Sequence, residues 1–172
     1  AKQGEDLGTE YVLDLLERFQ LSHDEHNKVA RYCEGKGILH MCTPWDSDSI
    51  ISLEALDVKA YKVASADLTN LPLIESLIAT KKPLILSTGM SSIEEIQISA
   101  DFLNARNAEF ALLHCNSTYP APFHDINLNW IKKLRDINPL VGYSGHERGI
   151  AVTLAAVALG AKVVERHFTF DR

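Results

Sequence analysis

The sequence has 172 residues, of which 46% are hydrophobic and 23% are charged. This length and composition predict about one globular domain, and they exclude a disordered, collagen-like or disulfide-scaffold chain. Seventeen Lys and Arg against 23 Asp and Glu give a net charge of −6, and the longest basic runs are two Lys-Lys pairs, so a nucleic-acid or anionic-membrane partner is disfavoured.

The first part of the chain is predicted to be helical. Residues 1–21 form an expected N-terminal helical lead-in. Ser22 then precedes Glu25 with the spacing of a capping box, which predicts the start of a further helix. Gly37 stands just before the next apolar run, where a chain that leaves a helix needs a positive φ.

Six strand-like apolar runs follow, separated by segments with helical periodicity. The runs start 22 to 30 residues apart, near Ile38, Ala60, Pro83, Phe110, Leu140 and Lys162. Apolar residues share a helical face at Ile50, Leu53 and Leu56, and again at Leu71, Ile74, Leu77 and Ile78. Ser92 with Glu95 indicates another helix start, and Gly160 another helix end. The alternation predicts βα units, whose strands are parallel.

The predicted fold class is α/β, as a (β/α)8 TIM barrel rather than an open doubly wound sheet. No GxGxxG or GxxxxGK[ST] motif opens a helix, so the nucleotide-binding open sheets lack their main signal. One polar residue after a strand usually just begins a loop, but here polar residues end all six runs. In a barrel these ends open on the face that holds active sites. The residues are Thr43, Lys62, Ser65, Ser87, Thr88, Asn116, Ser117, Ser144, His146 and His167.

The residue types at these ends suit a small anion and a metal ion. An ammonium group and short hydroxyl donors can replace the water around a phosphate or carboxylate, and this set contains Lys62, Thr43, Ser65, Ser87 and Ser144. His146 and His167 are candidate metal ligands, although two histidines alone are more often structural. Because two imidazoles leave coordination positions open, they favour Mn²⁺ or Mg²⁺ in an open catalytic site over a closed zinc site.

Six runs of the sequence resemble the sialic acid synthase (N-acetylneuraminate synthase) family. They are TPWD, YKVASADLTNLPL, KPLILSTGM, LLHCNSTYPAP, VGYSGHERGI and AAVALGAKVVERHFTFD, and the resemblance extends from about Ser22 onward. Members of this family condense phosphoenolpyruvate with an N-acylated amino sugar. The resemblance implies that the chain covers about six βα units, strands three to eight of the barrel. Residues 1–172 are then expected to form a partial TIM-barrel catalytic domain.

The resemblance also implies roles for particular residues. His146 and His167 match the family's ligands of the divalent ion, expected here to be Mn²⁺ or Mg²⁺. Lys62 and Asp67 match catalytic positions, with Asp67 standing where the family usually has Glu. The phosphoenolpyruvate-binding positions match Thr43, Lys62, Ser65, Ser87, Ser117, Tyr119 and Ser144.

Four further residues complete the expected site. Asn116 stands where Thr is common in the family, and Gly145 replaces an Asp that many bacterial members carry. His114, inside the apolar run FALLHC, is expected to be a core residue or to support the site residues from behind the pocket. Glu165 lies two residues before His167 and therefore points to the same side of its strand, as a pocket or supporting carboxylate.

The implied function is a synthase that joins phosphoenolpyruvate to a sugar of the N-acetylmannosamine type, giving a sialic acid-like nonulosonic acid and phosphate. The same chemistry in legionaminic or pseudaminic acid synthesis is the first alternative. A metal-dependent barrel hydrolase or lyase is another, but it would ordinarily need a carboxylate-rich metal site or a clear nucleophile and base. An inactive sugar-binding barrel would be expected to have lost the histidines and Lys62. The resemblance also implies a homodimer.

Cysteine usage and hydropathy predict a cytoplasmic location. The three cysteines, Cys33, Cys42 and Cys115, are odd in number and lack CxxC spacing, so they are expected to be free and mostly buried. The N-terminal sequence has no apolar signal core, and no apolar run approaches the ~18–20 residues that span a bilayer.

Overall fold

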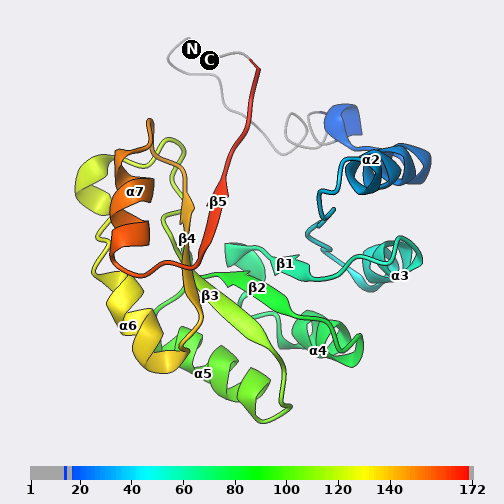
Figure 1. Cartoon of the computed structure of the whole chain (residues 1–172). Helices are drawn as coiled ribbons and strands as arrows, with labels where there is room; N and C mark the ends of the chain where they lie inside the picture. The colour runs from blue at the N-terminus through cyan, green and yellow to red at the C-terminus, as the bar shows by residue number, and fades with distance from the viewer. Residues whose placement is uncertain (1–13, 15–16, 171–172) are drawn as a thin grey trace. The chain divides into compact units, whose positions relative to one another are not determined.

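The computed structural model describes Asp14 and residues 17–170 of the chain, in two compact units formed by residues 1–40 and 41–172 (Figure 1). The first unit contains helix α2, His23–Gly35. Its start is a complete capping box, because Ser22 Oγ accepts a hydrogen bond from the Glu25 N–H and the Glu25 carboxylate accepts one from the Ser22 N–H at 2.8 Å. After the helix, Gly37 has a φ of 69°. The predicted capping box and helix end are confirmed.

The predicted lead-in over residues 1–21 lies largely outside the described residues. Within the part that is described, Asp14 and residues 17–19 are helical, and residues 20–21 are not.

The second unit is a parallel sheet whose strands follow one another in chain order (Figure 1). Its strands are β1 (Tyr61–Val63), β2 (Leu84–Ser87), β3 (Phe110–Cys115), β4 (Val141–Gly145) and β5 (Val163–Arg166). The helices are α3 (Ser47–Ala55), α4 (Leu71–Ala79), α5 (Ile93–Asn104), α6 (Trp130–Ile137) and α7 (Ala151–Ala158), with 3₁₀ turns η1 (Ser65–Asp67) and η2 (Phe123–Asp125). Parallel neighbours need crossover connections, and α4 to α7 supply them along one face of the sheet.

Side-chain caps fix where three of these helices begin. Asp46 accepts a hydrogen bond from the Ser49 N–H, and Asn70 accepts one from the Leu73 N–H. Ser92 forms the second predicted capping box, with Glu95. Each cap satisfies backbone N–H groups that the first turn of a helix leaves unpaired.

The hydrophobic core lies between the sheet and the helices. Alternate strand residues enter it, namely Tyr61, Val63, Leu84, Leu86, Phe110, Leu112, Val141 and Tyr143. The predicted apolar helix faces meet them there: Ile50, Leu53, Ile74 and Leu77 are buried, and Leu56, Leu71 and Ile78 are partly buried. Because side chains alternate along a strand, the residues between these positions face the opposite side of the sheet.

That opposite face is concave. Strand β1 is four strand spacings from β5, so in a flat sheet Lys62 and Glu165 would be about 19 Å apart. Lys62 Nζ is instead 3.4 Å from a carboxylate oxygen of Glu165. Close packing accompanies this curvature, since a Cβ added to Gly142 would lie 2.4 Å from both a Leu113 methyl and the Val163 carbonyl oxygen. The sheet therefore curls into part of a barrel wall, with helices outside.

Five of the six expected strands form. The run that begins near Ile38 is not assigned as a strand, because the described backbone gives it a single bond to the sheet, from the Lys62 N–H to the Cys42 carbonyl at 3.4 Å. A ladder requires repeated bonds of this kind, and Pro44, which has no N–H, follows closely. The predicted positive φ at Gly160 is confirmed, at 104°.

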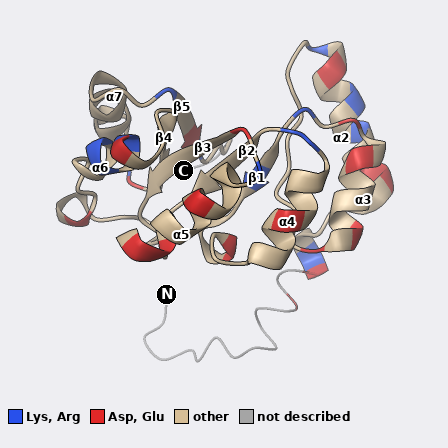
Figure 2. Ribbon diagram, turned by 90° about the horizontal axis from the view of Figure 1, so that it is seen from below, with Lys and Arg blue, Asp and Glu red and all other residues tan. Residues whose placement is uncertain are grey.

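Three further properties bear on the expectations from composition. The three cysteines are free as predicted, but only Cys115 is buried, and Cys33 and Cys42 are half-buried. Lys and Arg share α2 and α6 with acidic residues (Figure 2). Across the described part of the chain, the helices fall short of the length and apolar content that a bilayer crossing requires.

Candidate functional site

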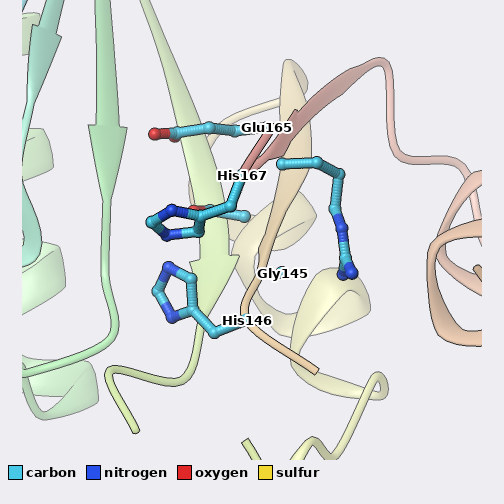
Figure 3. Close-up of a pocket in the computed structure, with 6 residues that line it drawn as sticks. Gly145, His146, Glu165 and His167 are labelled. Atoms are coloured by element: carbon cyan, nitrogen blue, oxygen red, sulfur yellow. The ribbon is translucent and has the colours of Figure 1, made fainter. Parts of the chain in front are cut away.

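His146 and His167 come together at the carboxyl ends of β4 and β5 (Figure 3). In the ladder between these strands, Ser144 pairs with Glu165 and Gly145 pairs with Arg166, so the residues that follow are neighbours too. The imidazole centroids are 5.3 Å apart and the ring planes meet at 61°. Both side chains line a pocket of about 110 Å³, together with Ser144, Gly145, Glu165 and Arg166.

A backbone hydrogen bond determines which nitrogen of His146 is free. Its Nδ1 lies 2.6 Å from the carbonyl oxygen of Asn116, which can only accept, so Nδ1 carries the proton. Burial lowers the pKa of His146 below its ordinary value, opposed in part by the bond to Asn116. The imidazole is therefore neutral near pH 7, with the lone pair on Nε2. This is the form in which histidine binds a metal ion.

The two histidines fit an open metal site rather than a closed one. Within residues 17–170 and Asp14, no cluster of three or more His, Cys, Asp and Glu side chains is arranged to hold an ion. Two adjacent imidazoles, one of them with Nε2 set free by its backbone bond, fit a divalent ion that completes its shell with water or substrate oxygens.

Tyr119 contacts both imidazoles. Its ring stacks on His146 with centroids 4.0 Å apart and an interplanar angle of 28°, and it meets His167 edge-on at 5.6 Å. Tyr119 therefore covers one side of the histidine pair.

Lys62 supplies a buried positive charge on the concave face. Its residue exposure is 8%, and Nζ donates a hydrogen bond to the Val63 carbonyl at 3.0 Å. The second neighbour of Nζ is Glu165, the carboxylate at 3.4 Å. Glu165 also lines the histidine pocket, on the same side of β5 as His167 (Figure 3), as its spacing predicts. One carboxylate thus links the ammonium group to the histidines.

The segments that follow β1, β2 and β3 meet at Gly89. The Gly89 N–H donates to Ser65 Oγ at 3.1 Å, and a Cβ on Gly89 would lie 2.6 Å from Ser117 Oγ. Only glycine permits so close an approach of these loops. Ser144 and Ser87 are both buried, and within the described residues Ser87 Oγ has no hydrogen-bond partner. An unpaired buried hydroxyl costs stability and is suited to a ligand oxygen.

Two predicted site residues are less closely connected to the others. Asp67 Oδ1 accepts a hydrogen bond from Asn70 at 3.1 Å, while its Oδ2 is buried and has no partner among the described residues. Thr43 is half-buried, and in the described part of the chain its side chain makes no hydrogen bond to another candidate residue. The structure places Asp67 at the end of the 3₁₀ turn η1 and Thr43 in a loop.

His114 is a core residue, as the sequence predicts. Its Nε2 lies 2.5 Å from the Ile126 carbonyl oxygen, and burial lowers the pKa of the imidazole. Thr88 is also buried. Its hydroxyl donates a hydrogen bond to the Leu113 carbonyl of β3 at 3.0 Å, so it connects the end of β2 to the neighbouring strand. Asn116 accepts from the Thr118 N–H at 2.9 Å and presents its own carbonyl to His146.

Glu147 is a buried carboxylate that the sequence analysis missed. Its side chain is 0% exposed and forms an ion pair with Arg166 and a 2.7 Å hydrogen bond with the Tyr143 hydroxyl. The available signal was that an acidic residue directly follows one histidine and a basic residue directly precedes the other. Only the pairing of Gly145 with Arg166 brings the two together.

Comparison with known proteins gives consistent matches. The model described as the NeuB family matches residues 1–172. N,N'-diacetyllegionaminic acid synthase of Campylobacter jejuni is 39% identical over 167 residues, which cover 95% of this chain and 50% of that protein. N-acetylneuraminate-9-phosphate synthase of Homo sapiens is 38% identical over 155 residues, which cover 89% of this chain and 43% of that protein.

A solved structure agrees in fold as well. The crystal structure of N-acetylneuraminic acid synthetase from Leptospira borgpetersenii, in complex with citrate, superimposes with a TM-score of 0.91 at 32% identity and covers 98% of this chain and 59% of that chain. This chain spans about half the length of the curated relatives it matches.

Proposed function

The chain belongs to the NeuB family, and from this premise we propose that it is the part of a synthase that condenses phosphoenolpyruvate with an N-acylated amino sugar. The reaction joins C3 of phosphoenolpyruvate to the aldehyde carbon of the open-chain sugar. Water adds at C2, and phosphate leaves with cleavage of its C–O bond. The product is a sialic acid-like nonulosonic acid. The relatives named for sialic and legionaminic acids support this class of product.

The proposed architecture is a (β/α)8 barrel of which this chain supplies about six βα units, strands three to eight. Residues 1–172 are then a partial catalytic domain, with residues 1–21 as a helical lead-in. The curled sheet supports the proposal, because continued curvature with more strands closes a barrel. The candidate groups also lie at the carboxyl ends of the strands, where barrel enzymes hold their active sites.

Lys62 and the neighbouring hydroxyls bind phosphoenolpyruvate in this proposal. The substrate carries a phosphate and a carboxylate, and the ammonium group of Lys62 is a buried donor for one of them. Ser87 offers an unpaired hydroxyl, while Ser65 and Ser117 lie on either side of Gly89. Thr43, Tyr119 and Ser144 complete the binding set. Holding both anionic groups fixes the direction in which C3 points, which lowers the entropic part of the barrier.

His146 and His167 hold the divalent ion, Mn²⁺ or Mg²⁺. When bound, such an ion acts as a Lewis acid that polarises the sugar aldehyde. His146 meets this role because its bond to Asn116 leaves Nε2 as the ligand atom. Tyr119, stacked on His146, keeps bulk water from one side of the pair.

Asp67, at the end of the 3₁₀ turn that follows β1, is proposed as the catalytic carboxylate. Its Oδ2 is buried and unpaired among the described residues, so it can accept a hydrogen bond from the water that adds at C2.

The resemblance also supports a homodimer, which light scattering of the purified full-length protein would test.

The single observation on which the proposal depends is the concave face itself. There Glu165 pairs with the buried Lys62 and also lines the pocket of the two adjacent histidines. An anion site beside a metal site is what this condensation requires, because one substrate is anionic and the other needs an activated carbonyl.

The test is the reaction of the full-length protein with phosphoenolpyruvate that carries oxygen-18 in its bridging position. With N-acetylmannosamine, its 6-phosphate and the diacetamido sugars as acceptors, we expect Mn²⁺-dependent phosphate release for at least one sugar. The label should leave in the phosphate. Label retained in the organic product would contradict C–O cleavage. Binding of sugar without phosphate release from any acceptor would instead favour an inactive sugar-binding barrel.

A further inference from the structure

The ion pair between Glu147 and Arg166 joins the segments that carry the two histidines. Glu147 directly follows His146, and Arg166 directly precedes His167. Arg166 Nη1 bonds the Glu147 carboxylate, while Nη2 donates to the backbone carbonyls of Glu147 at 2.6 Å and Gly149 at 3.1 Å. One guanidinium therefore fastens the turn after β4 to the end of β5.

The carboxylate of the pair is fully buried and has several hydrogen-bond partners, whereas the Arg166 side chain is 28% exposed. The Glu147 side chain is 0% exposed, and it also accepts from the Tyr143 hydroxyl at 2.7 Å and contacts the Thr153 hydroxyl at 3.5 Å. A buried carboxylate is strongly unfavourable without partners, so removal of either member leaves the other uncompensated.

Side-chain alternation places the ion pair on the core side of the strands, although Arg166 also forms part of the wall of the histidine pocket. Tyr143, the partner of the pair, belongs to the core between sheet and helices. Side chains alternate along β5, so Arg166 faces this side, while Glu165 and His167 face the concave side. The hydrogen bonds thus connect the ends of β4 and β5 on the side that faces the helices, and they leave the imidazoles free for a ligand.

Gly145 is required by the same arrangement. A Cβ at this position would lie 2.3 Å from Arg166 Nη1 and 2.7 Å from a carboxylate oxygen of Glu147. Any larger residue must displace the guanidinium or the carboxylate. The absence of a side chain here is therefore matched to the ion pair.

We infer that Glu147 and Arg166 are positioning residues that set the separation of His146 and His167, and with it the affinity for the divalent ion. This inference rests on the proposed function, because it assigns the histidines to a metal site. Neither residue belongs to the proposed substrate-binding set. Their effect is exerted through the backbone of the two strand ends.

The test measures Mn²⁺ binding to the full-length protein by electron paramagnetic resonance, which reports free Mn²⁺ directly. Glu147→Gln and Arg166→Lys should each weaken Mn²⁺ binding roughly tenfold or more, the range seen when groups that support metal ligands are removed. Gly145→Ala disturbs the pair without altering any charge and should act in the same direction. In crystals of the metal-free variants, the imidazole centroids should depart from 5.3 Å.

The matched control is the exposed ion pair of Glu75 and Arg106, whose Arg106 Nε lies 2.6 Å from the Glu75 carboxylate. Glu75→Gln and Arg106→Lys make the same chemical changes away from the strand ends and should leave Mn²⁺ affinity within about twofold. Circular dichroism confirms the fold of each variant. If Glu147→Gln does not fold, Arg166→Lys and Gly145→Ala decide the question.

The outcomes separate the inference from the proposed function. Folded Arg166→Lys and Gly145→Ala variants with wild-type Mn²⁺ affinity would overturn the inference and leave the synthase proposal standing. A wild-type protein that binds no Mn²⁺ and releases no phosphate would overturn both. The kinetic signature is a lower kcat at saturating Mn²⁺ with an unchanged KM for phosphoenolpyruvate, because Lys62 lies on another strand.

Discussion

Lys62 and Glu165 face each other across the concave side of the sheet, with Nζ 3.4 Å from the carboxylate. They do so although three strands lie between β1, which carries Lys62, and β5, which carries Glu165. A buried ammonium group needs a counter-charge, and Glu165 is the acidic partner that the structure gives it. An anionic substrate that reaches Lys62 therefore meets a site already neutralised. Under the proposed function, such an anion competes with Glu165 for the ammonium group of Lys62.

Lys62→Met should weaken the binding of phosphoenolpyruvate much more than the binding of the sugar. Methionine keeps most of the length of the side chain and removes the charge-assisted hydrogen bond, which is typically worth about 1.5–3 kcal/mol. The KM for phosphoenolpyruvate should thus rise at least ~10-fold, with little change in the KM for the sugar. Steady-state kinetics with each substrate varied in turn provides the measurement.

Lys82→Met is the matched control for this variant. Lys82 is also paired with a carboxylate, at 2.5 Å from Glu54, but it is only partly buried and precedes β2, whereas Lys62 lies within β1 on the concave face. It should leave both KM values unchanged. Equal losses for the two substrates in Lys62→Met would count against an anion-specific role for Lys62.

His146→Ala and His167→Ala should each abolish metal-dependent phosphate release. Each change removes one of two protein ligands from the ion, and the structure offers no third ligand among the described residues to replace it. Thermal melting should change little, because both imidazoles project into a pocket instead of the core. His124→Ala, at an exposed histidine, should keep full activity. Full turnover in both histidine variants after chelation would contradict the assignment of His146 and His167 as metal ligands.

Ser87→Ala should cost substrate affinity but not stability. The Ser87 hydroxyl is buried without a partner among the described residues, and such a group is destabilising by about 1–3 kcal/mol. Its removal should therefore leave the melting temperature the same or higher while raising the KM for phosphoenolpyruvate.

Ser99→Ala provides the opposite case. Ser99 is equally buried, but its hydroxyl donates to the Leu68 carbonyl at 2.8 Å. Its loss should lower stability by about 1 kcal/mol and leave the KM values alone. If the two serine variants shifted stability in the same direction and by the same amount, this would contradict the interpretation of the Ser87 hydroxyl as an unpaired group that binds a ligand.

His114 should make the protein less stable in mild acid. Burial lowers the pKa of the native imidazole, so below about pH 6.5 the unfolded chain binds a proton that the folded chain does not. Stability then falls with decreasing pH, by at most about 1.4 kcal/mol per pH unit, until the native imidazole protonates too. Urea unfolding between about pH 7.5 and about pH 5.5 measures the slope.

His114→Gln keeps a donor near the Ile126 carbonyl but cannot titrate, so the acid-side slope should become shallower. The same substitution at exposed His124 should leave the slope unchanged. An unaltered slope in His114→Gln would assign the acid sensitivity to other groups.

Local signals in the sequence predicted most of the second unit. Ser92 and Glu95, or Leu77 and Ile78, act within a few residues of each other, so chain order alone reveals the helix they form. The strand that was not observed, near Ile38, depends instead on a ladder with distant residues, and its apolar composition could not show how many bonds it would make.

In the candidate site, too, the local features were predicted and the contacts between distant residues were not. His167 and Glu165 were predicted on one side of a strand, because alternation is a local rule, and both line the pocket. The ion pair of Glu147 with Arg166 was not predicted, since its members are 19 residues apart and meet only through the register of β4 and β5. Nothing in the sequence near Glu147 marks it as fully buried.

The stacking of Tyr119 on His146 gives the protein an optical reporter. The phenol ring contacts both imidazoles, at centroid distances of 4.0 and 5.6 Å, so any change at these rings alters the electronic surroundings of one tyrosine. Near-ultraviolet difference absorption should thus register an ion entering the histidine pair before any sugar is added, and Tyr119→Leu should silence that signal.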